Sequence, residues 1–267
     1  MIEIKGITKT YGKKQNAFLA LDNVTFTIPD GTTVAIIGKS GSGKSTLMHA
    51  ISGLDRPEVG EVIIDGENIL TLKQRKIDAF RASKMSFIFQ SFFIQPNETC
   101  YDNVVLPLEI AGVPRGQRRA KVEAALAAVE LTDKIRKKAA TLSGGQKQRL
   151  AIARAIVNEP KILFADEPTG NLDSTTGGIV EDFLFNYSKK NNATLIVVTH
   201  DQELAEKCDA QVVIVDGKVS SITGLDKTTP KSKAKVKAEK LLEPGDEEEL
   251  LEATNERPGK KGNGGAA

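Results

Sequence analysis

The chain has 267 residues, 40% of them hydrophobic, which is enough for one large α/β domain with a buried core. Its 37 basic and 35 acidic residues leave a formal net charge of +2, so the composition indicates no nucleic-acid surface. No stretch has the ~18–20 consecutive apolar residues of a membrane-spanning helix, and the N-terminus lacks the apolar block of a secretory signal. Because Cys100 and Cys208 fit no metal-binding spacing, we expect reduced thiols and a cytosolic protein.

Alternating apolar residues predict strands over much of the first 70 residues or so, including residues 59–64. The apolar run at residues 34–37 within this region is typical of a buried parallel strand. Comparable runs recur at residues 87–89, 162–165, 195–198 and 212–215. Since helical stretches separate most of these runs, the pattern predicts a wound α/β sheet.

A phosphate-binding loop is predicted directly after the run at residues 34–37. Residues 38–46 read GKSGSGKST, which matches the pattern GxxxxGK[ST] between a strand and a helix. Glycines let backbone N–H groups turn toward an anion, and a helix starting near Lys44 adds its positive end. We expect Lys44 to reach the β- and γ-phosphates of a nucleotide and Ser45 to bind Mg²⁺. The residues expected to bind the nucleotide here are Gly38, Ser40, Gly41, Gly43, Lys44, Ser45 and Thr46. A Gly/Ser turn that happens to contain a lysine is the alternative, and the loop alone leaves kinases, GTPases and motors open.

Residues 92–158 differ in pattern and predict a mostly helical lobe inserted into the sheet domain. Within them, residues 115–130 place Val122, Ala125, Leu126 and Val129 on one helical face.

A second anion site is predicted at residues 142–146, LSGGQ, which precede a helical stretch running to about Asn158. Ser143, Gly144 and Gly145 offer a hydroxyl, bare backbone N–H groups and a helix N-terminus. One nucleotide does not need two such sites far apart in one chain. We therefore infer that the second site serves a nucleotide bound to another subunit.

Two carboxylates, Asp166 and Glu167, end the apolar run at residues 162–165. The carboxyl end of a buried strand is where α/β sheets place ligands. We expect Asp166 to hold Mg²⁺ and Glu167 to polarise a water toward the γ-phosphate. A plain polar exit from the strand before Pro168 is the alternative.

The C-terminal segment changes composition. Between residues 226 and 267, nine basic and nine acidic side chains alternate in blocks, and the end is rich in glycine. We predict a folded domain at residues 1–224 and a charged, low-complexity, mostly disordered tail at residues 225–267, with a short helix possible at residues 247–253.

Taken together, LSGGQ, the following KQRLAIARA and the other motifs in their order resemble the ABC-type ATPases over about residues 1–224. The resemblance implies a P-loop fold of ABC type: a mixed sheet with an antiparallel β subdomain and an inserted helical lobe. It also implies ATP and Mg²⁺ as ligands, and a dimer in which each ATP lies between the two copies, against residues 143–146 of the partner, Gln146 included.

Further site residues follow from the resemblance alone. Tyr11 resembles the aromatic residue that stacks on adenine, and Gln90 the glutamine between the lobes, near Mg²⁺ and the reaction. Asp173, in residues 171–173, resembles part of the loop that crosses the dimer interface, and His200 the histidine that touches the γ-phosphate. Each has a simpler alternative: edge-strand packing for Tyr11, a solvated loop position for Gln90, and helix capping for His200.

Residues 53–57, 92–96, 103–108 and 169–174 resemble the branch that includes the lipoprotein-release and macrolide-export ATPases and the cell-division ATPase FtsE. This implies a peripheral protein on the cytoplasmic face of the membrane, an integral permease-like partner, and export or transmembrane force transmission. Asp102 stands where glutamate is common in the family, and Lys147 where many relatives have glutamine. The alternatives are an FtsE-like regulatory ATPase, a soluble ABC ATPase acting on DNA or ribosomes, and a small P-loop kinase.

Overall fold

The computed structural model describes residues 1–12 and 16–225. The tail predicted for residues 225–267 lies outside this range, apart from Leu225. The strands are β1 (Ile2–Tyr11), β2 (Phe18–Ile28), β3 (Thr33–Ile37), β4 (Val59–Ile64), β5 (Glu67–Asn68), β6 (Met85–Phe89), β7 (Ile162–Asp166), β8 (Thr194–Thr199), β9 (Ala210–Val215) and β10 (Lys218–Thr223). The α-helices are α1 (Lys44–Ile51), α2 (Gln74–Lys84), α3 (Cys100–Ile110), α4 (Arg115–Ala128), α5 (Gly144–Ile156), α6 (Ser174–Asn191) and α7 (Gln202–Lys207).

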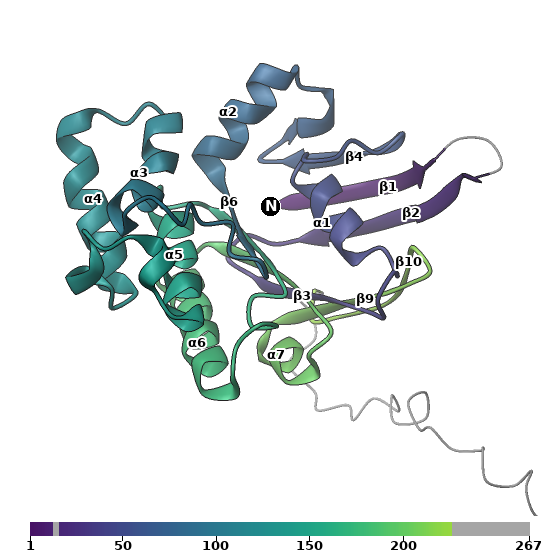
Figure 1. Ribbon diagram of the computed structural model, residues 1–267. Coiled ribbons are helices and arrows are strands. Elements are labelled where there is room, and N and C mark those ends of the chain that lie inside the picture. The colour runs from purple at the N-terminus through teal and green to yellow at the C-terminus, as the bar shows by residue number, and fades with distance from the viewer. Residues whose placement is uncertain (13–15, 226–267) are drawn as a thin grey trace, which may run out of the picture. The chain divides into compact units, whose positions relative to one another are not determined.

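The strands form two sheets (Figure 1). A four-stranded antiparallel sheet has the order β2-β1-β4-β5, and a six-stranded sheet has the order β10-β9-β3-β8-β7-β6. Within the larger sheet all pairs are parallel except β9 with β10, which closes one edge as an antiparallel hairpin. The structure thus confirms a mixed sheet with an antiparallel β part.

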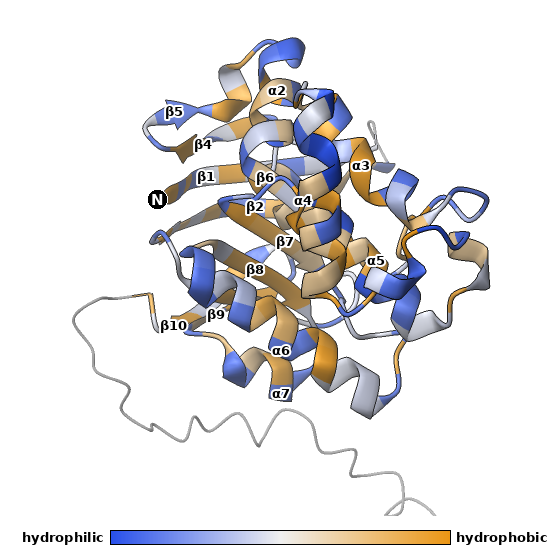
Figure 2. Ribbon diagram, turned by 90° about the vertical axis from the view of Figure 1, so that its left-hand side faces the viewer, coloured by the Kyte–Doolittle hydropathy of each residue, from blue (hydrophilic) through white to orange (hydrophobic). Residues whose placement is uncertain are grey.

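The strands β3, β7 and β8 of the larger sheet are buried on both faces, and their side chains alternate between two cores. On β8, Ile196 and Val198 join the core that also contains β1, β2 and α1, whereas Leu195 and Val197 join the core formed with the helices. Helix α1 contacts β1, β2 and β8 and so lies between the two sheets. Figure 2 shows the apolar strands β7 and β8 in orange, next to helices whose outer surfaces carry polar, blue segments. Two-sided burial explains why these strands read as continuous apolar runs rather than as alternating patterns.

The helices α3, α4 and α5 fall within residues 92–158 and pack on one another beside β6 (Figure 1). On α4, the apolar face predicted from the sequence is buried, with Val122 and Leu126 at 0% exposure. The unusual Asp102 has a local structural role, because it completes a capping box with Thr99 at the start of α3. The Thr99 hydroxyl accepts from the backbone N–H of Asp102 at 3.1 Å, and the Asp102 carboxylate accepts from that of Thr99 at 3.2 Å.

None of the helices in the described part of the chain is both long enough and apolar enough to cross a membrane.

Candidate nucleotide-binding site

A cleft of about 770 Å³ opens at the carboxyl ends of the central parallel strands. The phosphate-binding loop follows β3, and Gln90, Glu167 and His200 directly follow β6, β7 and β8, which lie side by side in the sheet. Parallel strands end at a common edge, so these segments converge although they are far apart in sequence. The predicted residues that line the cleft are Tyr11, Ser40, Gly41, Gly43, Lys44, Ser45, Thr46, Gln90, Asp166, Glu167 and His200.

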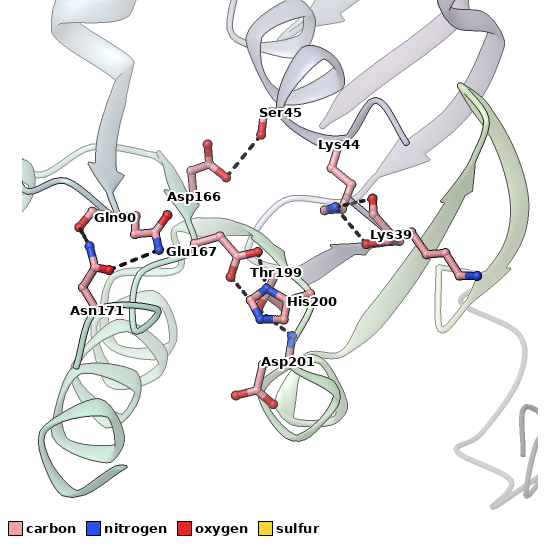
Figure 3. A network of polar contacts seen from close by, with 11 residues as sticks. Lys39, Lys44, Ser45, Gln90, Asp166, Glu167, Asn171, Thr199, His200 and Asp201 are labelled. Atoms are coloured by element: carbon pink, nitrogen blue, oxygen red, sulfur yellow. Dashed lines mark hydrogen bonds and ion pairs between the residues drawn. The ribbon is translucent and has the colours of Figure 1, made fainter. Parts of the chain in front are cut away.

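The phosphate-binding loop adopts backbone conformations that require glycine. Gly41 and Gly43 have φ values of 78° and 102°, and a Cβ on Gly43 would lie 2.5 Å from the carbonyl oxygen of Ala20. Helix α1 begins at Lys44, so its N-terminal N–H groups face the cleft. The Lys44 ammonium donates to the carbonyl oxygens of Gly38 and Lys39, each at 2.8 Å (Figure 3). Gly38 therefore does not line the cleft itself but anchors the lysine that does.

Ser45 and Asp166 approach each other across the cleft. The Ser45 hydroxyl donates to Asp166 Oδ1 at 3.5 Å, and both oxygens come from cleft-lining residues. Burial raises the pKa of Asp166, and the hydrogen bond from Ser45 opposes that shift. No group of three or more His, Cys, Asp or Glu side chains that could hold a metal ion occurs in residues 1–12 and 16–225. One hydroxyl and one carboxylate fit Mg²⁺, which usually takes one or two protein ligands together with substrate phosphates and water.

Glu167 is held in a strained conformation by the end of β8. Its φ is 47°, a left-handed value unusual for a residue with a side chain, and its backbone N–H donates to Val198 O at 2.9 Å. His200 Nδ1 lies 2.8 Å from Glu167 Oε1, and the Thr199 hydroxyl donates to Oε2 at 3.4 Å (Figure 3). The His200 side chain is 74% exposed and that of Glu167 only 19%. The two side chains therefore form a pair whose histidine faces the open cleft.

Helix capping at the end of β8 is carried out by Asp201 and not by His200. The Asp201 carboxylate accepts from the backbone N–H groups of Glu203 and Leu204 at 2.8 and 3.3 Å, which caps α7. The imidazole of His200 is thus not used for the capping role considered from the sequence.

Gln90 is fixed by the loop that precedes α6. Its Nε2 donates to Asn171 Oδ1 at 3.3 Å, and Asn171 Nδ2 donates to the Gln90 carbonyl oxygen at 3.0 Å (Figure 3). Gly170 packs beside the same amide, since a Cβ there would lie 2.9 Å from Gln90 Nε2. Gln90 is therefore not a freely solvated loop residue.

The second predicted anion site is not part of this cleft. Ser143, Gly144, Gly145, Gln146 and Asp173 are absent from the cleft walls formed by the described residues. Ser143 and Gln146 form a capping box at the start of α5, and the Asp173 carboxylate accepts from the backbone N–H of Thr176 at 3.0 Å to cap α6. That hydrogen bond lowers the pKa of Asp173. Each of these side chains thus has a structural role within its own chain.

Several residues of the site were not found by sequence reasoning. Phe18 and Val198 line the cleft, and Thr199 holds Glu167. Asn171 was placed only in a loop at the dimer interface, and its contact with Gln90 was not predicted. Phe18 is 59% exposed and stands directly opposite Tyr11 in the antiparallel register of β1 and β2. The sequence contains this aromatic residue, but nothing in it places Phe18 next to Tyr11. Only the register of β1 and β2 shows that the two rings lie together.

A phosphate loop between β3 and α1 faces paired carboxylates at the end of β7, a parallel strand separated from β3 by β8. This arrangement defines a P-loop nucleoside-triphosphatase. The family model described as ABC transporter matches residues 21–170. The chain belongs to the ABC transporter family and is an ATP-binding, ATP-hydrolysing subunit of that family.

Individual relatives agree with this assignment. The chain is 40% identical to the lipoprotein-releasing system ATP-binding protein LolD of Syntrophus aciditrophicus, over 82% of this chain and 98% of LolD. It is also 40% identical to the macrolide export ATP-binding/permease protein MacB of Brucella abortus, over 87% of this chain but only 36% of MacB. Its fold is similar to that of the ATP-binding cassette MJ0796, solved as a dimer with ADP and Pi, with a TM-score of 0.78, 38% identity, and coverage of 84% and 99% of the two chains.

Proposed function

We propose that two copies of the chain bind ATP head to tail and power a separate membrane-embedded subunit for export or transmembrane force transmission. The observation that carries this proposal is the division of the predicted site into two parts. The cleft gathers the phosphate loop, Asp166, Glu167 and His200, whereas residues 143–146 and Asp173 lie outside it. The dimeric MJ0796 structure supports pairing as the way to bring two such parts together.

In the proposed site, the loop N–H groups and Lys44 bind the phosphates once the ammonium leaves the carbonyl oxygens of Gly38 and Lys39. Ser45 and Asp166 would hold Mg²⁺, with Gln90 nearby, and the ion would neutralise charge on the phosphate oxygens. Tyr11 at the cleft mouth would stack on the nucleobase.

Glu167 is the proposed base. Its carboxylate is largely buried, yet it lines the cleft, so it is placed to take a proton from water as that water attacks the γ-phosphate. His200 holds one carboxylate oxygen at 2.8 Å and faces the cleft, so we propose that it orients the base and contacts the γ-phosphate.

The proposal of a separate membrane subunit is supported by the relatives that the chain matches. It covers 98% of LolD, the ATP-binding protein of a lipoprotein-releasing system, and its match to MacB lies in a protein that is both ATP-binding and permease. A peripheral position on the cytoplasmic face of the membrane follows from this proposal. Copurification from a gentle detergent extract tests it: a permease-like membrane protein is expected, and recovery of nucleic acid or ribosomes instead would overturn this part.

Glu167→Gln tests the catalytic proposal, because it keeps the shape of the side chain and removes its basicity. ATP turnover is expected to fall by about 100-fold or more, the scale of general-base catalysis, while ATP-dependent dimers accumulate in light scattering. Glu206→Gln, at an exposed position on α7, is the matched control. Wild-type turnover in Glu167→Gln would exclude the base role.

A further inference from the structure

The ring of Tyr11 is held at the cleft mouth by two charged side chains that do not line the cleft. The Tyr11 hydroxyl donates to Asp55 Oδ2 at 2.7 Å. The Lys9 ammonium donates to Asp55 Oδ1 at 2.9 Å and lies 5.1 Å from the centroid of the Tyr11 ring. The ring is thus contacted both at its hydroxyl and by a cation.

The two charges form a partly buried pair rather than a loose surface contact. The Lys9 side chain is 10% exposed and that of Asp55 34%. Lys9 also donates to the carbonyl oxygen of Arg56 at 2.8 Å, and Glu58 lies 3.4 Å from its ammonium. Burial opposes ionisation of Asp55, but the hydrogen bonds from Lys9 and Tyr11 outweigh it and lower its pKa. A charged acceptor makes the hydrogen bond from the tyrosine stronger than one to a neutral group.

The same aspartate is tied to the helix that carries the phosphate loop. Lys44, Ser45 and Thr46 at the start of α1 line the cleft. At the other end of the helix, the backbone N–H of Asp55 donates to the carbonyl oxygen of His49 at 3.2 Å. Helix α1 therefore connects the phosphate end of the cleft to the residue that holds the aromatic ring.

We infer that Asp55, supported by Lys9, is a positioning residue that fixes the Tyr11 ring in register with the phosphate loop and so sets the affinity for the nucleobase. An exposed ring that is already ordered loses less side-chain freedom when a base stacks on it. This inference rests on the proposed contact between Tyr11 and the base. It differs from a purely structural role, in which the ion pair would only join β1 to the segment after α1.

The test compares Mg²⁺-ADP with Mg²⁺-pyrophosphate, measured by calorimetry on the full chain. Pyrophosphate presents the two phosphates of ADP without its ribose and base, and the use of ADP rather than ATP avoids hydrolysis during the measurement. Asp55→Ala is expected to weaken ADP binding by about 3- to 10-fold, the equivalent of one hydrogen bond. The affinity for pyrophosphate is expected to stay unchanged. Asp22→Ala is the matched control, since Asp22 has the same 34% side-chain exposure and pairs with Lys218 at 3.1 Å.

A double-mutant cycle shows whether Asp55 acts through the tyrosine hydroxyl. In the Tyr11→Phe background, Asp55→Ala is expected to have no further effect on ADP. The inference would be overturned if Asp55→Ala lowered the affinities for ADP and pyrophosphate equally. It would also be overturned if Asp55→Ala lowered the ADP affinity as much in the Tyr11→Phe background as in the wild type. If Asp55→Ala does not fold, Tyr11→Phe alone removes the same hydrogen bond at a residue that is 39% exposed. A loss of affinity for ADP but not for pyrophosphate in this variant supports the same conclusion.

Tyr11→Ala separates this inference from the function on which it rests. A stacked base contributes about 1–3 kcal/mol, so this variant is expected to weaken ADP binding by about 5- to 150-fold. Unchanged affinity in Tyr11→Ala would refute the base contact itself. A loss in Tyr11→Ala with none in Asp55→Ala would refute only the positioning role.

Discussion

Asn171 and Gln90 hold each other through two hydrogen bonds, one to a side chain and one to the main chain. They come from segments that follow different strands, β6 and β7, and their contact links the two loops at the edge of the cleft. Because Gln90 Nε2 donates to Asn171, its Oε1 is the end of the amide that remains to accept a water or bind a cation. The orientation of Gln90 is therefore set by the loop before α6.

Gly170→Ala is expected to displace the Gln90 amide. The new Cβ would lie 2.9 Å from Gln90 Nε2 and 3.4 Å from its Cδ. We expect kcat for ATP hydrolysis to fall about 10-fold with ADP affinity within about 2-fold, since small misplacements near reacting groups are costly while the phosphate loop is untouched. Gly178→Ala, where a Cβ meets nothing within 4 Å, is the control. Equal kcat values for the two variants would show that the position of Gln90 does not limit turnover.

Gly144→Ala tests the proposed contact with a partner's nucleotide. A Cβ on Gly144 meets nothing within 4 Å in its own chain, and alanine favours the helix that begins there. The monomer should therefore be as stable as wild type or slightly more so. In a Glu167→Gln background, we expect Gly144→Ala to abolish or weaken ATP-driven pairing by about 10-fold or more, because the methyl group occupies the space of a close phosphate approach. Undiminished pairing in size-exclusion chromatography would contradict the shared site.

Ser143 is a weaker test of the same contact. Its hydroxyl already caps α5 by accepting from the backbone N–H of Gln146 at 3.3 Å. Replacing a capping serine by alanine costs about 1 kcal/mol of helix stability on its own. A loss of pairing in Ser143→Ala would therefore mix a folding effect with a binding effect, which Gly144→Ala avoids.

Much of the sheet and the phosphate loop could be predicted because their signals are local. The run at residues 34–37 lies within β3, which is buried on both faces, and its apolar character follows from that burial. The glycines and the lysine of the loop at residues 38–46 all lie within one short segment, so their pattern can be recognised without knowing the rest of the fold. Such features depend on neighbours in the chain, so the order of residues was enough to find them.

The contacts around Tyr11 could not be predicted, because they depend on pairing between strands. The register of β1 with β2 shifts between Ile4 and Ile7, between Ile7 and Lys9, and between Lys9 and Thr10. Bulges of this kind change which face a side chain occupies, and no simple alternation shows them. As a whole residue Lys9 is consequently only 8% exposed, although a lysine in an alternating strand reads as a solvated residue. Its partner Asp55 is brought close only by the packing of α1 between the sheets.

Arg154→Lys is expected to destabilise the protein. The Arg154 guanidinium is largely desolvated and donates to the carbonyl oxygens of Phe93 and Phe92 at 2.6 and 2.8 Å, and burial lowers its pKa. Those two residues have left-handed φ values of 47° and 55°, so the arginine helps to hold a strained turn just after Gln90. Lysine lacks the planar fork that bonds both oxygens.

We expect Arg154→Lys to lower the free energy of unfolding by about 1–3 kcal/mol in urea titrations, the range for hydrogen bonds to a charged donor. Arg149→Lys on the same helix is the control, because Arg149 pairs with the exposed Glu130 at 2.9 Å. That change should stay within about 0.5 kcal/mol of wild type. Equal effects of the two substitutions would mean that the turn at Phe92 and Phe93 does not depend on the guanidinium.

Asp166→Asn should change the pH dependence of stability in the absence of nucleotide and metal. Burial raises the pKa of Asp166 in the folded protein above that in the unfolded chain. The folded state then binds more protons than the unfolded state at pH values between the two pKa values, so the wild type loses stability as the pH rises through that window.

Asparagine is neutral at every pH and keeps an oxygen that can accept from Ser45. The melting temperature of Asp166→Asn minus that of wild type is therefore expected to be near zero below the unfolded pKa, to rise through the window and to level off above it. Because Asp166 is only partly buried, we expect a plateau of roughly 1–3 °C, equivalent to about 1 kcal/mol or less. A difference that shrinks as the pH rises would show that the carboxylate is stabilised, not penalised, by its surroundings.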